Sequence, residues 1–130
     1  MITPGITGRH EVVVTEELTA AHVGSGLAPV FATPMLVALM EQACAESVAP
    51  LLDEGQSTVG THIDIAHSAA TPMGMSVWCE SCLIEVDRRR LTFSVKAYDE
   101  AGPVGEGVHE RFIIDNAKFM DKVNGKKSAR

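Results

Sequence analysis

Apolar residues run almost without interruption through TPMLVALMEQACAESV (residues 33–48), and this pattern predicts one long helix. Thr33 followed by Pro34 has the order of an N-cap and a first helical residue, and Pro50 marks the expected end. The stretch is apolar on nearly every side. A helix of this kind must be covered all round, so we expect it at the centre of the molecule.

Strand-like segments lie on both sides of this helix. Residues 10–17 are rich in β-branched residues and predict one strand, which a Gly- and Pro-punctuated segment (18–32) connects to the helix. The sequences EVDRRR and DEAGP predict hairpin turns between later strands, and the tail from about residue 118 is predicted to begin as a short helix and end loose and basic. Alternating or β-branched runs predict four further strands at residues 58–69, 75–86, 90–100 and 104–115.

This order of elements predicts α+β architecture in a single domain spanning residues 1–130, without a repeat or a linker. An antiparallel sheet of about five strands, wrapped around one long central helix, covers that helix on one side only. A second copy of the chain would complete the burial. The pattern therefore describes a hot-dog fold and implies a homodimer.

The formal net charge of -6 argues against non-specific binding to nucleic acid or to anionic membranes. The start of the sequence lacks a charged leader followed by an apolar run, and no apolar stretch is long enough to span a bilayer. The three cysteines fit reduced thiols better than a disulfide framework. We therefore expect a cytoplasmic protein with no nucleic-acid or membrane partner.

Glu41 interrupts the middle of the apolar helix. The residues one turn away on its face are all apolar or small: Val37, Ala38, Cys44 and Ala45. An unpaired carboxylate in such surroundings is costly, so Glu41 is either present for chemistry or satisfied by backbone donors. The first interpretation is favoured.

Thr33 and His67 are further candidates for chemistry. As an N-cap, Thr33 lacks the reciprocal glutamate or glutamine of a capping box, so its hydroxyl is free for another partner. A period of two along residues 58–69 places His67 at the edge of the apolar face, where its imidazole could meet the helix. The same period places Gly60 and His62 on the opposite face.

Other polar patterns favour structural roles. The two histidines of HIDIAH point oppositely and have no third ligand at a suitable spacing, so no metal site is predicted. The C-x-x-C pattern of WCESC lies within a strand, with Cys79 and Cys82 on opposite faces, which favours plain thiols over redox chemistry. The turn DRRR fits a solvated turn, with a phosphate contact through Arg88 and Arg89 as the alternative. His109 is predicted to be an ordinary strand histidine.

With these residues assembled, the chain resembles the fluoroacetyl-CoA thioesterase family of hot-dog enzymes, from about Val30 to Lys122. The segments that carry the resemblance are FATPMLVALMEQAC, VGTHIDIAHSAATPMG, RRLTFSVKAYDE and GEGVHERFII. The resemblance implies that Thr33, Glu41 and His67 are the catalytic residues and that Gly60 lies near the active site. It also implies an acyl-CoA substrate and no separate cofactor, because CoA is part of that substrate.

The chain departs from the family pattern before the helix. The family's namesake carries a longer, phenylalanine-bearing lid there, whereas this chain has HVGSGLAPVFA with Phe31 as its only aromatic residue and a candidate substrate contact. The expected function is therefore hydrolysis of an acyl-CoA thioester without strict selectivity for the fluoroacetyl group. The alternatives are a non-catalytic domain that binds acyl-CoA or another small acyl ligand, and a hot-dog hydratase or dehydratase.

The residue types suggest roles in thioester hydrolysis. Glu41 can act as nucleophile or as general base, and apolar surroundings would strengthen its basicity. His67 can orient groups and carry protons. Thr33 can hydrogen-bond the acyl group or Glu41, beside the backbone donors at the helix N-terminus. The sequence does not choose between an anhydride and a direct attack by water.

Overall fold

The computed structural model describes residues 1–128, and the strand, helix and four-strand order is the predicted one. A 3₁₀ turn (Glu16–Leu18) and a short helix, α1 (Ala20–Val23), occupy the connection before the long helix α2 (Thr33–Val48), which a second 3₁₀ turn (Ala49–Leu51) follows. The strands are β1 (Thr7–Val13), β2 (Gln56–His67), β3 (Ser76–Asp87), β4 (Arg90–Asp99) and β5 (Gly102–Asp115).

The C-terminal tail is more helical than predicted. The predicted helical start of the tail is present as α3 (Asn116–Gly125), and a 3₁₀ turn (Lys126–Ser128) follows it where a loose end was expected. Phe119 and Val123, one turn apart, face a groove shared with the sheet, which gives this short helix an apolar side. Ala129 and Arg130 lie outside the described residues.

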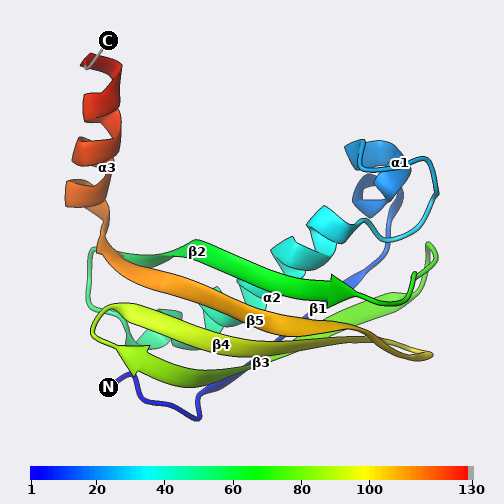
Figure 1. Ribbon diagram of the computed structural model, residues 1–130, viewed down its shortest axis with the longest axis horizontal. Helices are drawn as coiled ribbons and strands as arrows, with labels where there is room; N and C mark the ends of the chain where they lie inside the picture. The colour runs from blue at the N-terminus through cyan, green and yellow to red at the C-terminus, as the bar shows by residue number, and fades with distance from the viewer. Residues whose placement is uncertain (129–130) are drawn as a thin grey trace.

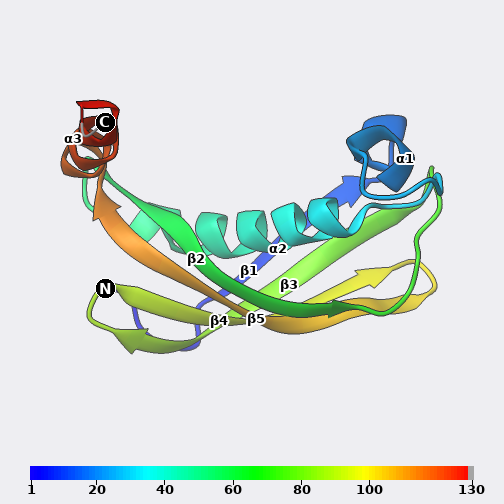
Figure 2. The ribbon, with the colours of Figure 1, turned by 45° about the horizontal axis from the view of Figure 1, so that its top comes forward.

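The five strands form one antiparallel sheet in the order β1-β3-β4-β5-β2. The sheet curls around α2, which lies on its concave side (Figures 1 and 2). Helix residues such as Leu36, Met40 and Cys44 are fully buried against sheet residues such as Leu83 and Phe93. The predicted α+β hot-dog architecture is confirmed. No described helix combines the length and the apolar character needed to cross a membrane.

Helix α2 is covered by the sheet on one side only. Four residues that recur every four positions along α2 are exposed in the single chain: Pro34, Ala38, Gln42 and Glu46. The α2 residues beside this row are only partly buried, although most of them are apolar. The dimer expected from the sequence would cover this side and stays a prediction.

Strand β2 forms an edge of the sheet and contains a β-bulge that corrects one prediction. Its register with β5 shifts between Gly60 and His62, so Thr61 is an extra residue in the ladder. Because of this extra residue, Gly60 faces α2 together with His67. Strict alternation had placed these two residues on opposite faces and was wrong at this point.

Candidate functional site

Thr33 and His67 meet at one end of the molecule. Ala32 is the N-cap of α2, and Thr33 is the first helical residue, with no side-chain cap hydrogen bond. The Thr33 Oγ1 instead lies 2.7 Å from Nδ1 of His67, the last residue of β2. The expected contact of the imidazole with the helix is therefore present, although Thr33 is not the cap.

His67 has one ring nitrogen without a partner. Its Nε2 is buried and makes no hydrogen bond with any described residue. Burial lowers the pKa of His67 below its ordinary value of 6.5, because desolvation opposes the charged imidazolium. The ring is therefore neutral at pH 7, and Nε2 is available to exchange a proton or a hydrogen bond with a group from outside the chain.

A pocket of about 250 Å³ opens beside this pair. Its wall combines the segment before α2 with the segment after β2, and Phe31 contributes to it while its side chain is held in the core. Pockets for drug-sized ligands are typically about 300–1,000 Å³, so this one suits a short acyl group. The lining residues are Ala20, Ser25, Val30, Phe31, Thr33, His67, Ser68, Ala69 and Ala70.

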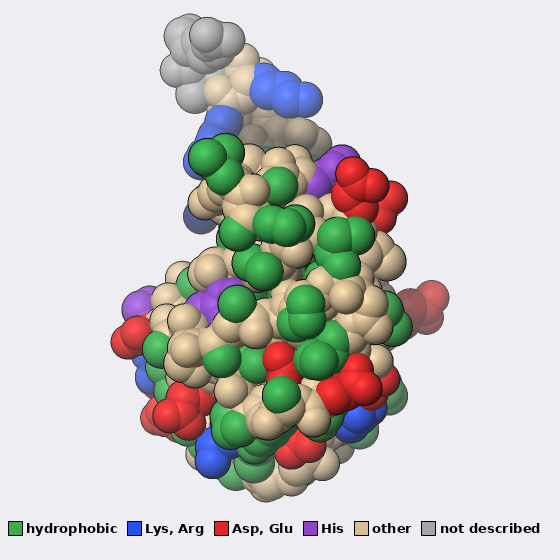
Figure 3. All heavy atoms as spheres, turned by 90° about the vertical axis from the view of Figure 1, so that its right-hand side faces the viewer, with side chains coloured by type: hydrophobic (Ala, Val, Ile, Leu, Met, Phe, Trp, Pro, Cys, Tyr) green, Lys and Arg blue, Asp and Glu red, His purple; other side chains and the backbone are tan. Residues whose placement is uncertain are grey.

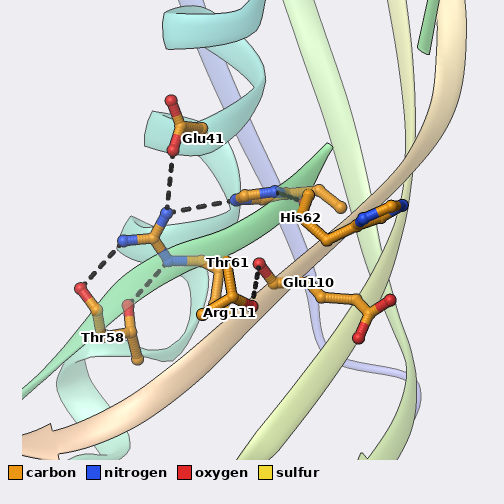
Figure 4. Close-up of polar contacts among 7 residues, drawn as sticks. Glu41, Thr58, Thr61, His62, Glu110 and Arg111 are labelled. Atoms are coloured by element: carbon orange, nitrogen blue, oxygen red, sulfur yellow. Dashed lines mark hydrogen bonds and ion pairs between the residues drawn. The ribbon is translucent and has the colours of Figure 1, made fainter. Parts of the chain in front are cut away.

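Glu41 has a charged neighbour that the helix pattern did not predict. Its Oε1 lies 3.6 Å from Nη1 of Arg111, and 41% of its side chain is exposed in the single chain (Figure 4). Gly60 faces the same carboxylate, and a Cβ at this position would lie 2.5 Å from Oε1. The surroundings of Glu41 are thus not purely apolar, and a glycine opposite it leaves the room that its side chain needs.

Arg111, on β5, holds this arrangement together and was missed from the sequence. It is only 7% exposed, so its charge needs partners. Its Nε donates to Oγ1 of Thr58 at 2.8 Å and its Nη2 donates to the Thr58 carbonyl at 2.9 Å (Figure 4). Its Nη1 lies 3.1 Å from Nε2 of His109. Four polar contacts therefore fix the guanidinium beside Glu41.

His109 is not an ordinary strand histidine. It is buried, and its Nδ1 lies 2.7 Å from the carbonyl oxygen of His62, which can only accept. Nδ1 therefore carries the proton, and Nε2 accepts from Arg111. Desolvation lowers the pKa of His109, which fits this neutral form. The available signal in the sequence was the period of two, which puts His109 and Arg111 on the same face of the strand as Gly107 and Ile113, opposite Glu106 and Glu110.

The Thr33–His67 pair and the group around Glu41 (with Thr58, His109 and Arg111) form two polar groups. They do not meet within one chain. Thr33 and Glu41 are separated by about 12 Å of rise along α2. His67 and Gly60, which contacts Glu41, are separated by about 20 Å along β2. A site that uses all three predicted catalytic residues therefore needs a second chain.

Arg88 and Arg89 lie far from the Thr33–His67 pocket. They form the β3–β4 turn, at the opposite end of the sheet from the last residue of β2. Arg89 Nη1 lies 3.7 Å from Asp115, where α3 begins, and Arg88 adopts a φ of 60° in the turn. Their predicted contact with a phosphate stays a prediction.

The cysteines and His62 show no arrangement typical of redox or metal chemistry within residues 1–128. Cys79 is buried and Cys82 lies on the opposite face, as predicted. Burial raises the pKa of the Cys79 thiol to about 12, which disfavours a reactive thiolate. His62 and His67 point oppositely, and no group of three or more potential ligands occurs among these residues.

Known proteins resemble this chain in both sequence and fold. The family described as fluoroacetyl-CoA-specific thioesterase matches residues 14–117. The fluoroacetyl-CoA thioesterase of Streptantibioticus cattleyicolor is 39% identical over 126 residues, which cover 92% of this chain and 91% of the relative. A solved structure of a fluoroacetyl-CoA thioesterase is 37% identical, has a TM-score of 0.92, and covers 97% of this chain and 98% of its own.

A second structural relative is more distant. A thioesterase superfamily member from Thermus thermophilus is 30% identical, has a TM-score of 0.89, and covers 100% of this chain and 98% of its own. The match to the family extends over most of the chain and includes every residue of the two polar groups. The chain therefore belongs to the fluoroacetyl-CoA thioesterase family of hot-dog enzymes.

Proposed function

We propose that the protein hydrolyses the thioester of a short acyl-CoA to a free carboxylate and CoA, without strict selectivity for the fluoroacetyl group. The observation that carries the proposal is the Thr33–His67 pair beside a small pocket, with a buried His67 Nε2 that has no partner among residues 1–128. Membership of a family of thioester hydrolases supports the reaction class.

The proposed active unit is a homodimer built on the β2 edges. The edge strand has free backbone groups, and Ile63, which faces α2, is 37% exposed. We place a two-fold axis near Asp64, with the two β2 strands antiparallel. Beyond the bulge, Gly60 of one chain then lies opposite the partner's His67. Because Gly60 faces Glu41, this pairing brings the carboxylate to the unpartnered Nε2.

The residues of this composite site divide the chemistry. The partner's Thr33 and the backbone N–H groups at the N-terminus of its helix bind the thioester carbonyl and the developing oxyanion. Glu41 either attacks the carbonyl to form an anhydride, which water cleaves, or removes a proton from the attacking water. The partner's His67, neutral at the start, takes up at Nε2 the proton that the water loses and passes it to the departing CoA thiolate, so the imidazole ends neutral. Arg111 keeps the Glu41 carboxylate in position throughout.

The segment before α2 supports weak fluorine selectivity. Its only aromatic residue, Phe31, contributes to the pocket wall but its side chain is held in the core, and Leu27, in the loop, is 97% exposed. Little in this segment is therefore positioned to distinguish fluorine from hydrogen on the acyl group. We expect the kcat/KM values for acetyl-CoA and fluoroacetyl-CoA to differ by less than about a hundredfold, or about 2.7 kcal/mol of differential transition-state binding.

The first test is thiol release from a panel of acetyl-, fluoroacetyl- and longer acyl-CoAs. Release from acetyl-CoA and somewhat larger acyl-CoAs is expected. Binding of acyl-CoA without release would instead indicate a non-catalytic domain, and action on an enoyl-CoA double bond would indicate a hydratase. A preference for fluoroacetyl-CoA above about a hundredfold would overturn the selectivity proposal.

The composite site has a separate test. Two inactive variants, Glu41→Gln and His67→Ala, are mixed under conditions that exchange subunits. A mixed dimer has one site with both native residues, so it should regain roughly half of the parental activity per dimer. Each variant alone serves as the control. A mixture that stays inactive despite demonstrated subunit exchange would contradict a site shared between chains.

A further inference from the structure

Helix α3 projects from the end of the sheet (Figure 1). It contains two lysines, and two more follow in the 3₁₀ turn after it. Lys118, Lys122 and Lys126 recur every four residues and share one side of the helical segment. Figure 3 shows blue side chains on this projecting segment, next to the grey C-terminal residues. The net charge of the chain is -6, so this row of lysines is a local positive surface that is suited to binding an anionic partner.

Most cationic side chains outside the C-terminal segment lie close to a carboxylate, whereas the lysines of that segment do not. Arg9, Arg89, Arg90 and Arg111 each have a carboxylate oxygen within 4.0 Å. Among residues 1–128, the cations without such a partner are the lysines of the C-terminal segment and two others. They are Arg88, Lys96, Lys118, Lys122, Lys126 and Lys127.

A groove of about 490 Å³ lies between α3 and the face of the sheet that points away from α2. Two lysines and two phenylalanines line it, and no carboxylate does. Phe112 is exposed there, which leaves an aromatic surface for a planar ring. The lining residues are Val59, Thr61, Phe112, Ile114, Phe119, Lys122, Val123 and Lys126.

The groove lies beside the proposed composite site. Val59 and Thr61 flank Gly60, which faces Glu41 on the other side of the sheet. In the proposed dimer the ladder between the two β2 strands ends at Gly60 and the partner's His67. The chain before Gly60 runs past that end to the base of α3, where Asn116 N donates to the Gly55 carbonyl at 2.9 Å. A long substrate that leaves the interface there passes α3.

We infer that the groove between α3 and the sheet binds the adenosine-phosphate end of the acyl-CoA substrate. This inference rests on the proposed thioesterase function. Phe112 and Phe119 contact the adenine ring, and Lys122 and Lys126 contact the phosphates as charge-assisted donors. A second copy of the chain is the less favoured occupant, because a protein surface that filled the groove would bury two lysine ammonium groups.

The test compares two substrates that share the same thioester. Acetyl-CoA carries the nucleotide, whereas S-acetyl-N-acetylcysteamine lacks it. In the Lys122→Ala/Lys126→Ala variant, kcat/KM for acetyl-CoA should fall about tenfold, mainly through KM, while the truncated substrate is unaffected. Lys122→Arg/Lys126→Arg should restore near-parental values. Lys96→Ala removes an equally unpaired cation from another part of the sheet and is the matched control.

The possible failures are distinguishable. An equal loss for both substrates, or no loss for acetyl-CoA, would overturn the nucleotide site and leave thioester hydrolysis intact. Dissociation of the alanine variant in analytical ultracentrifugation would assign the groove to a second copy of the chain and also overturn it. Failure of the parental protein to release thiol from either substrate would overturn the proposed function and, with it, this inference.

Discussion

The two polar groups carried by α2 differ in how fully one chain satisfies them. Around Glu41, the Arg111 guanidinium has partners in Thr58, His109 and the carboxylate itself. At the other end of the helix, Thr33 meets His67, but the second ring nitrogen is buried without a partner among the described residues. The guanidinium of the first group thus has partners within the described chain, whereas the imidazole of the second lacks one.

This difference indicates which group positions and which group reacts with something outside the chain. A buried polar atom without a hydrogen bond costs about 1–3 kcal/mol, so it is retained where a ligand or a second subunit supplies the partner. A complete network instead restricts motion, which is what a carboxylate needs if it must stay aligned for a reaction. The predictions below test whether these two groups form one working site.

The largest effect is expected for Glu41→Gln. The amide keeps the shape of the side chain but removes the charge and the basic oxygen, so turnover should fall at least about a hundredfold. The melting temperature should change little, because the ion pair is partly exposed and Arg111 keeps its other partners. Steady-state rates and thermal melting of the same preparations provide the measurement. Normal turnover per folded molecule, with melting several degrees lower, would show that Glu41 is structural.

The next effect tests the space reserved for the carboxylate. Gly60→Ala adds a Cβ 2.5 Å from Glu41 Oε1 and 3.1 Å from His109 Cε1, so the flexible Glu41 side chain must move. We expect turnover to fall about tenfold or more while the protein stays folded. Gly125→Ala, at a position with nothing within 4 Å of the added atom, is the control. Parental turnover in the Gly60 variant would mean that the position of this carboxylate is not critical.

A smaller effect is expected behind Arg111. His109→Leu removes the acceptor for Nη1, and the resulting unpaired donor should cost about 1–3 kcal/mol of unfolding free energy. Turnover should fall by about tenfold or less, because Thr58 still holds the guanidinium. His109→Gln can supply an acceptor to Arg111 and a donor to the His62 carbonyl, so it should recover part of both losses. Denaturant unfolding and kcat separate the two effects, and a Gln variant no better than Leu would contradict this role.

The smallest effect is a shift of the acid limb of activity. His67 and His109 are needed neutral, and burial lowers both pKa values below the ordinary 6.5. Each imidazole is therefore more than half neutral at pH 6.5, so activity at pH 6.5 should remain above roughly a quarter of its plateau even if either protonation inactivates the enzyme. The measurement is kcat/KM between pH 5 and 8. Activity at pH 6.5 below roughly a quarter of the plateau would contradict histidine pKa values lowered by burial.

Local patterns were sufficient for the elements of the fold. The apolar run ending before Pro50 predicted α2 within about one residue at its start and at its observed end, and four predicted strands match β2 to β5 within about two residues at each end. These predictions succeed because hydrophobic periodicity and turn residues act over short stretches of chain. The first strand was less accurate: its start and end both lie a few residues earlier than predicted, in a segment with little alternation.

Site geometry was predictable only where it depends on neighbours along the chain. The residue types Thr33, Glu41 and His67 were evident from the helix and strand patterns, and the structure does bring Thr33 and His67 together. It does not bring Glu41 to them within one chain. That separation follows from the rise of a helix between positions 33 and 41, which is a property of local geometry.

Only the tertiary structure decided what surrounds Glu41. The bulge at Thr61 turns Gly60 toward the helix, and such an extra residue depends on the pairing of β2 with β5. Arg111 reaches Glu41, with His109 behind it, because the curled sheet brings β5 against α2, whereas the sequence alone showed only a strand with several polar residues. By itself, the sequence determined the helix, the strands and the kinds of reactive side chain. Contacts between segments distant along the chain determined which of those side chains share a site, because strand register and sheet curvature arise only when the elements pack.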